Sequence, residues 1–181
     1  MSDYRRYRVQ GGTYFFTINL LNRHSDLLIR YIEALRDSVR RTRAERPFHI
    51  DALVVLPEHI HCVMTLPPGD DDFSNRIKAI KIRFVRAVEP DEWRSSVRAA
   101  KGERGIWQRR FWEHVIRDDD DFARHLDYVH FNPVKHGYVT SVAQWPYSTF
   151  HHWVAAGVYP KDWAGGEIAD IATGERSTYL R

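Results

Sequence analysis

The sequence predicts an α+β fold in which helices cover an antiparallel sheet. Aromatic and β-branched runs alternate with amphipathic segments, in the order strand, helix, strand, strand, helix, strand and helix. The length of 181 residues is enough for one domain with its own core. Hydrophobic residues make up 43% of the chain and charged residues 28%, which is typical of a folded globular protein.

The first strand and the first helix are expected between residues 12 and 45. The run GTYFFTINLL, residues 12–21, is rich in aromatic and β-branched residues and predicts a strand. Residues 25–45 predict an amphipathic helix that Pro47 ends. Its apolar residues recur at helical spacing: Leu28, Ile32, Leu35 and Val39.

A hairpin and a second helix are expected next. The runs FHIDALVVL (48–56) and HIHCVMTL (59–66) predict two strands joined by a short turn. Residues 72–88 repeat apolar residues at helical spacing and predict a helix with a strongly basic outer face. Residues 91–105 form a polar insertion whose structure the pattern does not predict.

The last strand and the third helix complete a known arrangement. Residues 105–117, GIWQRRFWEHVIR, predict a strand, and residues 118–134 predict a helix that closes at Pro133. The resulting order is the ferredoxin-like β-α-β-β-α-β unit followed by one added helix, with the first and third strands central. We expect residues 1–181 to form a single catalytic domain, with a loosely ordered tail from about residue 161.

Charge and cysteine content limit which partners and which cellular compartment the sequence predicts. The net charge is only +3, but Arg and Lys are spread among Phe, Tyr and Trp, which suits a polyanion with stackable bases. A solvated surface is the alternative for any one basic cluster. The single cysteine, Cys62, excludes an intrachain disulfide. No run approaches the ~20 apolar residues of a membrane span, and no signal peptide is recognised, so we expect a cytoplasmic protein without a membrane partner.

Two histidines stand one residue apart within an apolar strand. Side chains on a strand alternate faces, so His59 and His61 point to the same side while Ile60 points to the other. At a rise of ~3.3 Å per residue their Cα atoms lie ~7 Å apart, so both imidazoles can converge on one metal ion. The alternative is a pair of hydrogen-bonded histidines, and the spacing alone fixes neither the metal nor the chemistry.

The third helix carries a second group of polar side chains. Tyr128 and Asn132 are four residues apart and share one helical face. The apolar stripe of this helix lies to one side, so we expect Tyr128 to fall outside the stripe that buries the helix. Asn132 precedes Pro133, where we expect a frayed helix end. A packing tyrosine and a turn-forming asparagine are the alternatives.

These motifs together resemble the HUH single-tyrosine transposases, and within them the REP-associated tyrosine transposases of bacteria. The shared motifs are His-Ile-His on a strand, Tyr-x-x-x-Asn-Pro-Val-Lys-x-Gly from Tyr128, and Trp-Pro-Tyr-Ser from Trp145. The resemblance runs from about Tyr14 to Trp163. The segment PDEWRSSVRAAKGERG, residues 90–105, matches nothing in this pattern.

The resemblance implies a chemistry and a set of residues. His59 and His61 would bind a divalent metal, Mg²⁺ or Mn²⁺, with Asn132 as the third ligand. Tyr128 would be the nucleophile of a metal-dependent single-stranded DNA transesterase. Such an enzyme, a single-strand endonuclease and strand transferase, would cleave and rejoin DNA next to REP-like hairpins through a 5′-phosphotyrosine intermediate. The protein would act as a monomer or homodimer on hairpin DNA in the cytoplasm, associated with the nucleoid.

Basic and aromatic side chains are the expected DNA contacts. Phosphates attract Lys and Arg, and unpaired bases stack on aromatic rings. Trp107, Phe111 and Trp112 are the candidates for stacking, with core packing as their alternative. The expected phosphate-binding residues are Lys78, Lys81, Arg83, Arg86, Arg109, Arg110 and Lys135.

Other functions stay open from the sequence. A catalytically inactive or regulatory protein that binds nucleic-acid hairpins would keep the fold and lose turnover. A replication initiator or relaxase would share the histidine pair. A metal phosphodiesterase would leave free strand ends without a covalent adduct, whereas a transesterase forms a denaturation-resistant complex.

Overall fold

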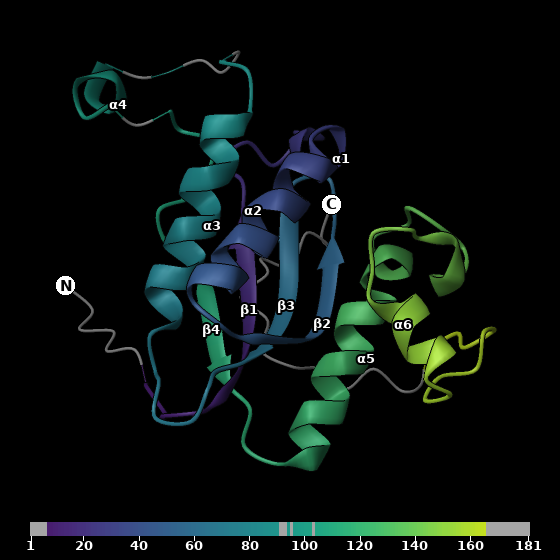
Figure 1. Cartoon of the computed structure of the whole chain (residues 1–181). Helices are drawn as coiled ribbons and strands as arrows, with labels where there is room; N and C mark the ends of the chain where they lie inside the picture. Colours follow the sequence, from purple (N-terminus) through teal and green to yellow (C-terminus); the bar gives the residue numbers. More distant parts are fainter. Residues whose placement is uncertain (1–6, 91–93, 95, 103, 166–181) are drawn as a thin grey trace.

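The computed structural model describes residues 7–90, 94, 96–102 and 104–165. Its sheet has four strands in the spatial order β2-β3-β1-β4, and every neighbouring pair is antiparallel. The strands are β1 (Thr13–Asn19), β2 (His49–Val55), β3 (His59–Thr65) and β4 (Trp112–Val115). The prediction that the first and third strands are central, as in a ferredoxin-like sheet, is confirmed (Figure 1).

Helices cover both faces of this sheet. The helices α2 (Ile32–Glu45) and α3 (Phe73–Ala87) lie on one face, and α5 (Asp119–Lys135) packs against β2 and β3 from the other (Figure 1). The alternation of strand side chains separates two cores. Phe16 and Cys62 join the core under α2 and α3, whereas Phe15 and Val63 join the core under α5.

The first expected helix is broken into two. A single turn, α1 (Leu27–Arg30), precedes α2, and Tyr31 between them has non-helical angles of φ −112° and ψ 37°. The amide of Leu28 donates to the carbonyl of Pro57, 3.2 Å away, which ties α1 to the turn between β2 and β3. This tertiary hydrogen bond sets the direction of α1 separately from that of α2.

The helix α5 does not end at Pro133, as the sequence pattern suggests. It continues to Lys135 with Pro133 in its last turn. His136 is the C-cap, and Gly137 after it has the left-handed φ of +73° that turns the chain away from the helix. The amide of Tyr138 then bonds the carbonyl of Pro133 at 3.0 Å. The frayed end predicted at Asn132 is therefore wrong.

The rest of the chain differs in detail from the predictions. The strand expected over 105–117 is reduced to β4, preceded by an isolated bridge between Leu20 and Trp107. The described part of the polar insertion contains a short helix, α4 (Ser96–Ala100). A 3₁₀ turn, η1 (Val142–Gln144), and α6 (Phe150–Ala155) follow α5.

Two further predictions concern the chain's end and membranes. Most of the tail predicted to be loosely ordered, residues 166–181, lies outside the described residues. Within the described part Trp163 packs against Tyr159, with ring centroids 4.7 Å apart.

Among the helices that are described, none has both the length and the apolar character to span a bilayer.

Candidate active site

The two histidines of β3 lie together under α5. His59 and His61 are fully buried, and their ring centroids are 4.8 Å apart at an interplanar angle of 83°. Strand alternation places both on the α5 face, as the sequence predicts, while Ile60 lies in the opposite core. Two nearly perpendicular imidazoles can direct their in-plane lone pairs toward one common point.

A neighbouring side chain orients each histidine. The Nδ1 of His61 lies 3.0 Å from the hydroxyl of Thr17 on β1, and the Nδ1 of His59 lies 2.8 Å from Oε1 of Glu58. Hydrogen bonds at Nδ1 fix the ring orientation and make Nε2 the ligand atom, as is usual in metal sites. The sequence pattern predicts Glu58 only as part of the turn between the two strands. A carboxylate directly before a His-x-His strand is the signal that points to its role.

Glu58 is itself held in the ionised state. Burial opposes its ionisation, but the hydrogen bond with His59 and the positive charge of Arg23 outweigh it and lower the pKa of Glu58. The Nη2 of Arg23 lies 3.3 Å from Oε1 of Glu58. The hydroxyl of Tyr138 donates to the other carboxylate oxygen at 3.3 Å. Burial and this carboxylate raise the pKa of Tyr138 to about 12, which makes Tyr138 a poor nucleophile.

Tyr128 lies against the histidine pair. Its ring centroid is 5.3 Å from that of His61 in an edge-to-face arrangement, and 5.9 Å from that of Phe15. Only 4% of Tyr128 is exposed, and it belongs to the core under α5. The expectation that Tyr128 falls outside the buried stripe is therefore wrong. The face of α5 that packs against β3 includes polar residues. A prediction from the apolar stripe alone therefore does not identify the whole buried face.

Lys135 reaches the same phenol. Its Nζ donates to the hydroxyl oxygen of Tyr128 at 2.8 Å and lies 4.5 Å from the centre of the ring. Two turns of helix separate the residues, so this contact depends on the continuation of α5 beyond Pro133. The sequence places Lys135 among phosphate-binding residues. The structure adds a direct contact with Tyr128.

Asn132 faces β3 between two residues that touch the histidines. Tyr128 and His136 lie four residues to either side of it, and the ring of His136 is 5.2 Å from that of His59. Asn132 is fully buried, and neither its Oδ1 nor its Nδ2 has a hydrogen-bond partner within the described part of the chain. A buried amide without partners is costly, which favours a ligand at this position.

A second cluster, the His–Asp–His triad of His114, Asp121 and His125, lies on the same face of the sheet. One ligand-type atom from each of the three residues lies within 4.8 Å of the others, so the triad could hold a metal ion. No local spacing in the sequence predicts it, because β4 contributes one residue and α5 the other two. His114 pairs with Phe15 across the sheet, which places it beside the core under α5.

The triad is internally hydrogen-bonded. The Nε2 of His114 donates to Oδ2 of Asp121 at 2.9 Å, and the Nδ1 of His125 donates to the carbonyl oxygen of Asp121 at 2.7 Å. Burial opposes ionisation of Asp121, but the hydrogen bonds from His114 and from the Arg117 amide outweigh it and lower its pKa to about 2. Burial also lowers the pKa of His125. The two imidazoles stack at an interplanar angle of 15°.

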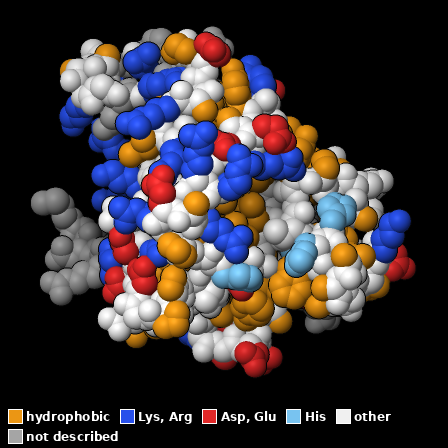
Figure 2. Space-filling model, in the orientation of Figure 1, with side chains coloured by type: hydrophobic (Ala, Val, Ile, Leu, Met, Phe, Trp, Pro, Cys, Tyr) orange, Lys and Arg blue, Asp and Glu red, His pale blue; other side chains and the backbone are white. Residues whose placement is uncertain are grey.

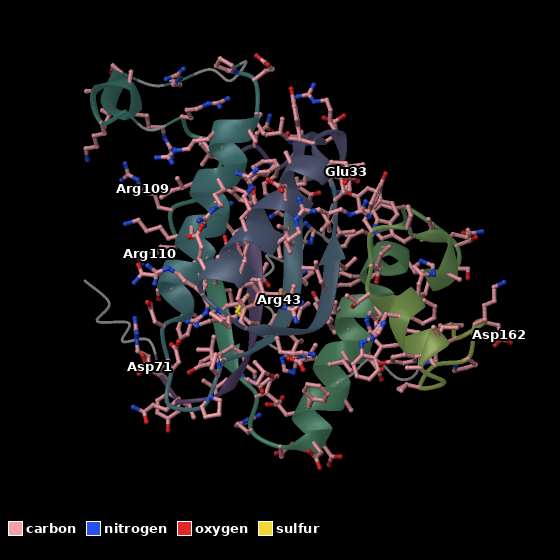
Figure 3. The ribbon with its side chains drawn as sticks, viewed as in Figure 1. Glu33, Arg43, Asp71, Arg109, Arg110 and Asp162 are labelled. Atoms are coloured by element: carbon pink, nitrogen blue, oxygen red, sulfur yellow. The ribbon has the colours of Figure 1, made fainter. Side chains whose placement is uncertain are left out.

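The expected DNA-binding residues fall into separate places. Lys78, Lys81, Arg86 and Arg109 line a groove beside α3. Arg83 faces α2 instead, where it bonds the hydroxyl of Thr42 at 2.9 Å and forms an ion pair with Glu45. Figure 3 shows Arg109 and Arg110 projecting on the side of α3 away from α2. Lys135 is the one residue of this set at Tyr128.

Comparison with known proteins identifies the family. No family model matches the chain. The chain is 51% identical to the REP-associated tyrosine transposase of Escherichia coli (strain K12) over 176 residues, or 97% of this chain and 98% of that relative. The chain belongs to the REP-associated tyrosine transposase family. This family assigns it to the DNA-processing enzymes in general, and the resemblance noted in the sequence is confirmed.

A solved structure of a REP-associated tyrosine transposase has the same fold. That protein, bound to a REP hairpin, is 51% identical and superposes with a TM-score of 0.83. The match covers 97% of this chain and 98% of the solved chain. The mixed architecture with a four-stranded antiparallel sheet is therefore that of a REP-associated tyrosine transposase.

Proposed function

We propose that the protein is a metal-dependent transesterase that cleaves and rejoins single-stranded DNA beside REP-like hairpins. One observation carries the proposal: Tyr128, which lies on α5, packs at 5.3 Å against His61 of a paired-histidine strand. The relative bound to a REP hairpin supports hairpin DNA as the partner. A monomer or homodimer associated with the nucleoid is part of the same proposal.

His59, His61 and Asn132 would hold the divalent metal, Mg²⁺ or Mn²⁺. Their chemistry fits: two imidazoles oriented through Nδ1 supply nitrogen ligands, and the buried amide of Asn132 supplies an oxygen that lacks a partner in the described structure. When bound, such an ion neutralises negative charge on the scissile phosphate. The ionised Glu58 strengthens the donor character of His59.

Tyr128 would be the nucleophile. Its phenol oxygen forms a bond to phosphorus while the bond from phosphorus to the 3′-oxygen breaks, which releases a 3′-hydroxyl and leaves a 5′-phosphotyrosine. The proton of the phenol replaces the bond lost by the 3′-oxygen. One phosphodiester is exchanged for another phosphoester, so the reverse reaction joins strands without ATP.

Lys135 would support this attack. Its ammonium donates a hydrogen bond to the phenol oxygen at 2.8 Å, so it stabilises the negative charge that develops there as the proton leaves. The ammonium also holds the ring through its contact with the aromatic face. Lys135 therefore positions and stabilises the nucleophile, in addition to any attraction for phosphate.

The substitution Tyr128→Phe tests the proposal. With labelled single-stranded hairpin DNA and Mn²⁺, the wild type is expected to form a denaturation-resistant complex, and the variant is expected to form none while it still binds the hairpin. Tyr138→Phe is the matched control, because Tyr138 lies beside His136 and bonds Glu58, and its loss should leave the adduct intact. An adduct with Tyr128→Phe, or its loss with Tyr138→Phe alone, would refute the assignment of the nucleophile.

The same assay distinguishes the proposed transesterase from two other functions. A hairpin-binding protein without turnover would bind the DNA tightly and give neither an adduct nor free strand ends. A phosphodiesterase would give free ends without an adduct.

A further inference from the structure

An apolar cavity opens between α2 and the β2 side of the sheet, on the face opposite the histidine pair. Its volume is about 580 Å³. Figure 2 shows a hollow beside α2, with hydrophobic side chains at its floor and Lys and Arg around it. Folded proteins contain few voids larger than a water molecule, and large apolar hollows at a surface are usually binding sites. A cavity of this size therefore indicates a ligand.

The floor of the cavity consists of side chains that two strands place on one face of the sheet. Ile60, Cys62 and Met64 alternate along β3, and Ile50 and Leu53 come from β2. The thiol of Cys62 is the one polar group among these five side chains. Burial raises the pKa of this thiol, so it carries no charge. The floor therefore offers aliphatic contact and almost no hydrogen bonds.

Two walls enclose this floor. On one side, Leu35 and Val39 lie on the face of α2 that meets the sheet. On the other side, the segment 146–149 runs along the outer edge of β2, where the amide of Thr149 donates to the carbonyl of Leu53 at 2.9 Å. Because backbone hydrogen bonds fix this second wall, the segment keeps its distance from α2 and the cavity stays open.

Three exposed arginines stand at the mouth of the cavity. Arg36, Arg40 and Arg43 recur at helical spacing along α2 and line the opening. Arg36 forms an ion pair with Glu33. Arg40 forms one with Asp37. Arg43 has no hydrogen bond or ion pair with any residue that the structure describes. Cations at the mouth of an apolar cavity attract a ligand with one anionic end.

We propose that this cavity binds a long-chain fatty acid, with its hydrocarbon chain on the floor and its carboxylate at the arginines. The volume falls within the range of about 300–1,000 Å³ that is usual for small-molecule sites. A nucleobase would bury donors and acceptors that an aliphatic floor cannot satisfy. A protein partner needs a broader contact of about 800 Å² on each side. The inference is independent of the proposed function.

Ligand displacement from the full chain tests the proposal. The probe is the fluorescent fatty acid 11-(dansylamino)undecanoic acid, and all ligands are used below their micelle concentrations. Laurate is expected to displace the probe. Decanoate, whose chain is shorter, should bind about tenfold more weakly because less apolar surface is buried. The alcohol 1-dodecanol, which has the chain of laurate without its charge, should bind about fivefold more weakly than laurate.

Two variants locate the ligand in the cavity. Arg43→Glu should weaken laurate about fivefold and leave 1-dodecanol unchanged. Its matched control is Arg41→Glu, at an exposed position of α2 that does not line the cavity. Val39→Trp fills the cavity and should weaken both ligands at least about tenfold, whereas Val97→Trp, at a residue that is 60% exposed on α4, should weaken neither. Arg43→Glu changes an exposed side chain, so it remains a test if Val39→Trp fails to fold.

The outcomes that overturn the proposal are distinct. If laurate does not displace the probe, or if decanoate and laurate bind equally, no hydrocarbon chain enters the cavity. If Arg43→Glu weakens 1-dodecanol as much as laurate, the arginine does not contact a carboxylate. If sedimentation shows a dimer that excludes the probe, a second copy of the chain occupies the cavity instead. The assay contains neither metal nor DNA, so a failure of the proposed cleavage chemistry does not affect its result.

Discussion

The histidine pair and the His–Asp–His triad lie on the same face of one sheet, yet their side chains are satisfied in different ways. The triad is hydrogen-bonded within itself, through His114 and His125 to Asp121. The pair is anchored from outside, by Thr17 and Glu58. Each ring of the pair is thus oriented through Nδ1 by its own partner, whereas both imidazoles of the triad are bonded to the same residue, Asp121.

The geometry of the rings separates the two clusters further. A metal ion binds imidazole in the plane of the ring. The two imidazoles of the triad are stacked at 15° with centroids 4.7 Å apart, so an ion close to both would lie out of the plane of at least one ring. The rings of the pair meet at 83°, so their planes intersect. We therefore propose that the pair is the metal centre and that the triad, although its atoms could hold an ion, serves as a structural link between β4 and α5.

The largest expected effect distinguishes the clusters directly. His61→Ala removes a proposed metal ligand and should reduce Mn²⁺-dependent cleavage by at least about 10²-fold, because charge stabilisation at the phosphate is lost. His114→Ala should leave the Mn²⁺ dependence of cleavage unchanged while it lowers stability. Cleavage rates across a Mn²⁺ titration check both, and the reverse result would make the triad the catalytic metal site.

A smaller effect is expected from Lys135, which contacts Tyr128 beside the histidine pair. Lys135→Met keeps the aliphatic stem but removes the hydrogen bond to Tyr128, so the single-turnover rate should fall about 10–100-fold. Hairpin affinity should change much less, and Lys135→Arg should restore part of the rate. Arg124→Met is the matched control, because Arg124 lies 3.6 Å from Asp121 in the second cluster. Equal losses of rate and affinity would reduce Lys135 to a phosphate contact.

The smallest effect concerns stability at acid pH. The folded-state pKa of Asp121, about 2, is below its usual value of ~3.9, so the unfolded chain binds the proton more readily. This stabilisation is present above about pH 4 and is lost as the pH falls toward 2. Asp121→Asn should lower the free energy of unfolding by about 1–3 kcal/mol at neutral pH and flatten its acid dependence.

Urea unfolding at pH 7 and at pH 3 measures this prediction. Asp120→Asn, an exposed first-turn position on the same helix, is the control and should change little. If Asp120→Asn and Asp121→Asn behaved alike, the triad would not be the structural link described above.

The comparison also indicates what a sequence can predict. The shared face of His59 and His61 follows from strand alternation alone, which is why it was predicted and found. The burial of Tyr128 was not predicted, since it depends on which side of α5 meets β3. The contact of Lys135 with Tyr128 does not follow from a helix that closes at Pro133, because it needs α5 to continue to Lys135. Gly137 was the better stop signal, because only its left-handed conformation ends the helix.

Residues from separate elements were the hardest to predict. The triad joins His114 of β4 to two residues of α5, and no local spacing brings them together. The hydrogen bond from Arg104 to the carbonyl oxygen of Val88 at the end of α3 likewise depends on how the 90–105 segment folds back. Periodicity describes one element at a time, whereas these contacts are set by tertiary packing.

A crystal soaked in Mn²⁺ and measured by anomalous scattering tests the central claim most directly. The account predicts a peak coordinated by Nε2 of both His59 and His61, with the side-chain oxygen of Asn132 as a further ligand and the Tyr128 hydroxyl beside the open positions. A peak within the His114, Asp121 and His125 triad, with none at the histidine pair, would contradict it.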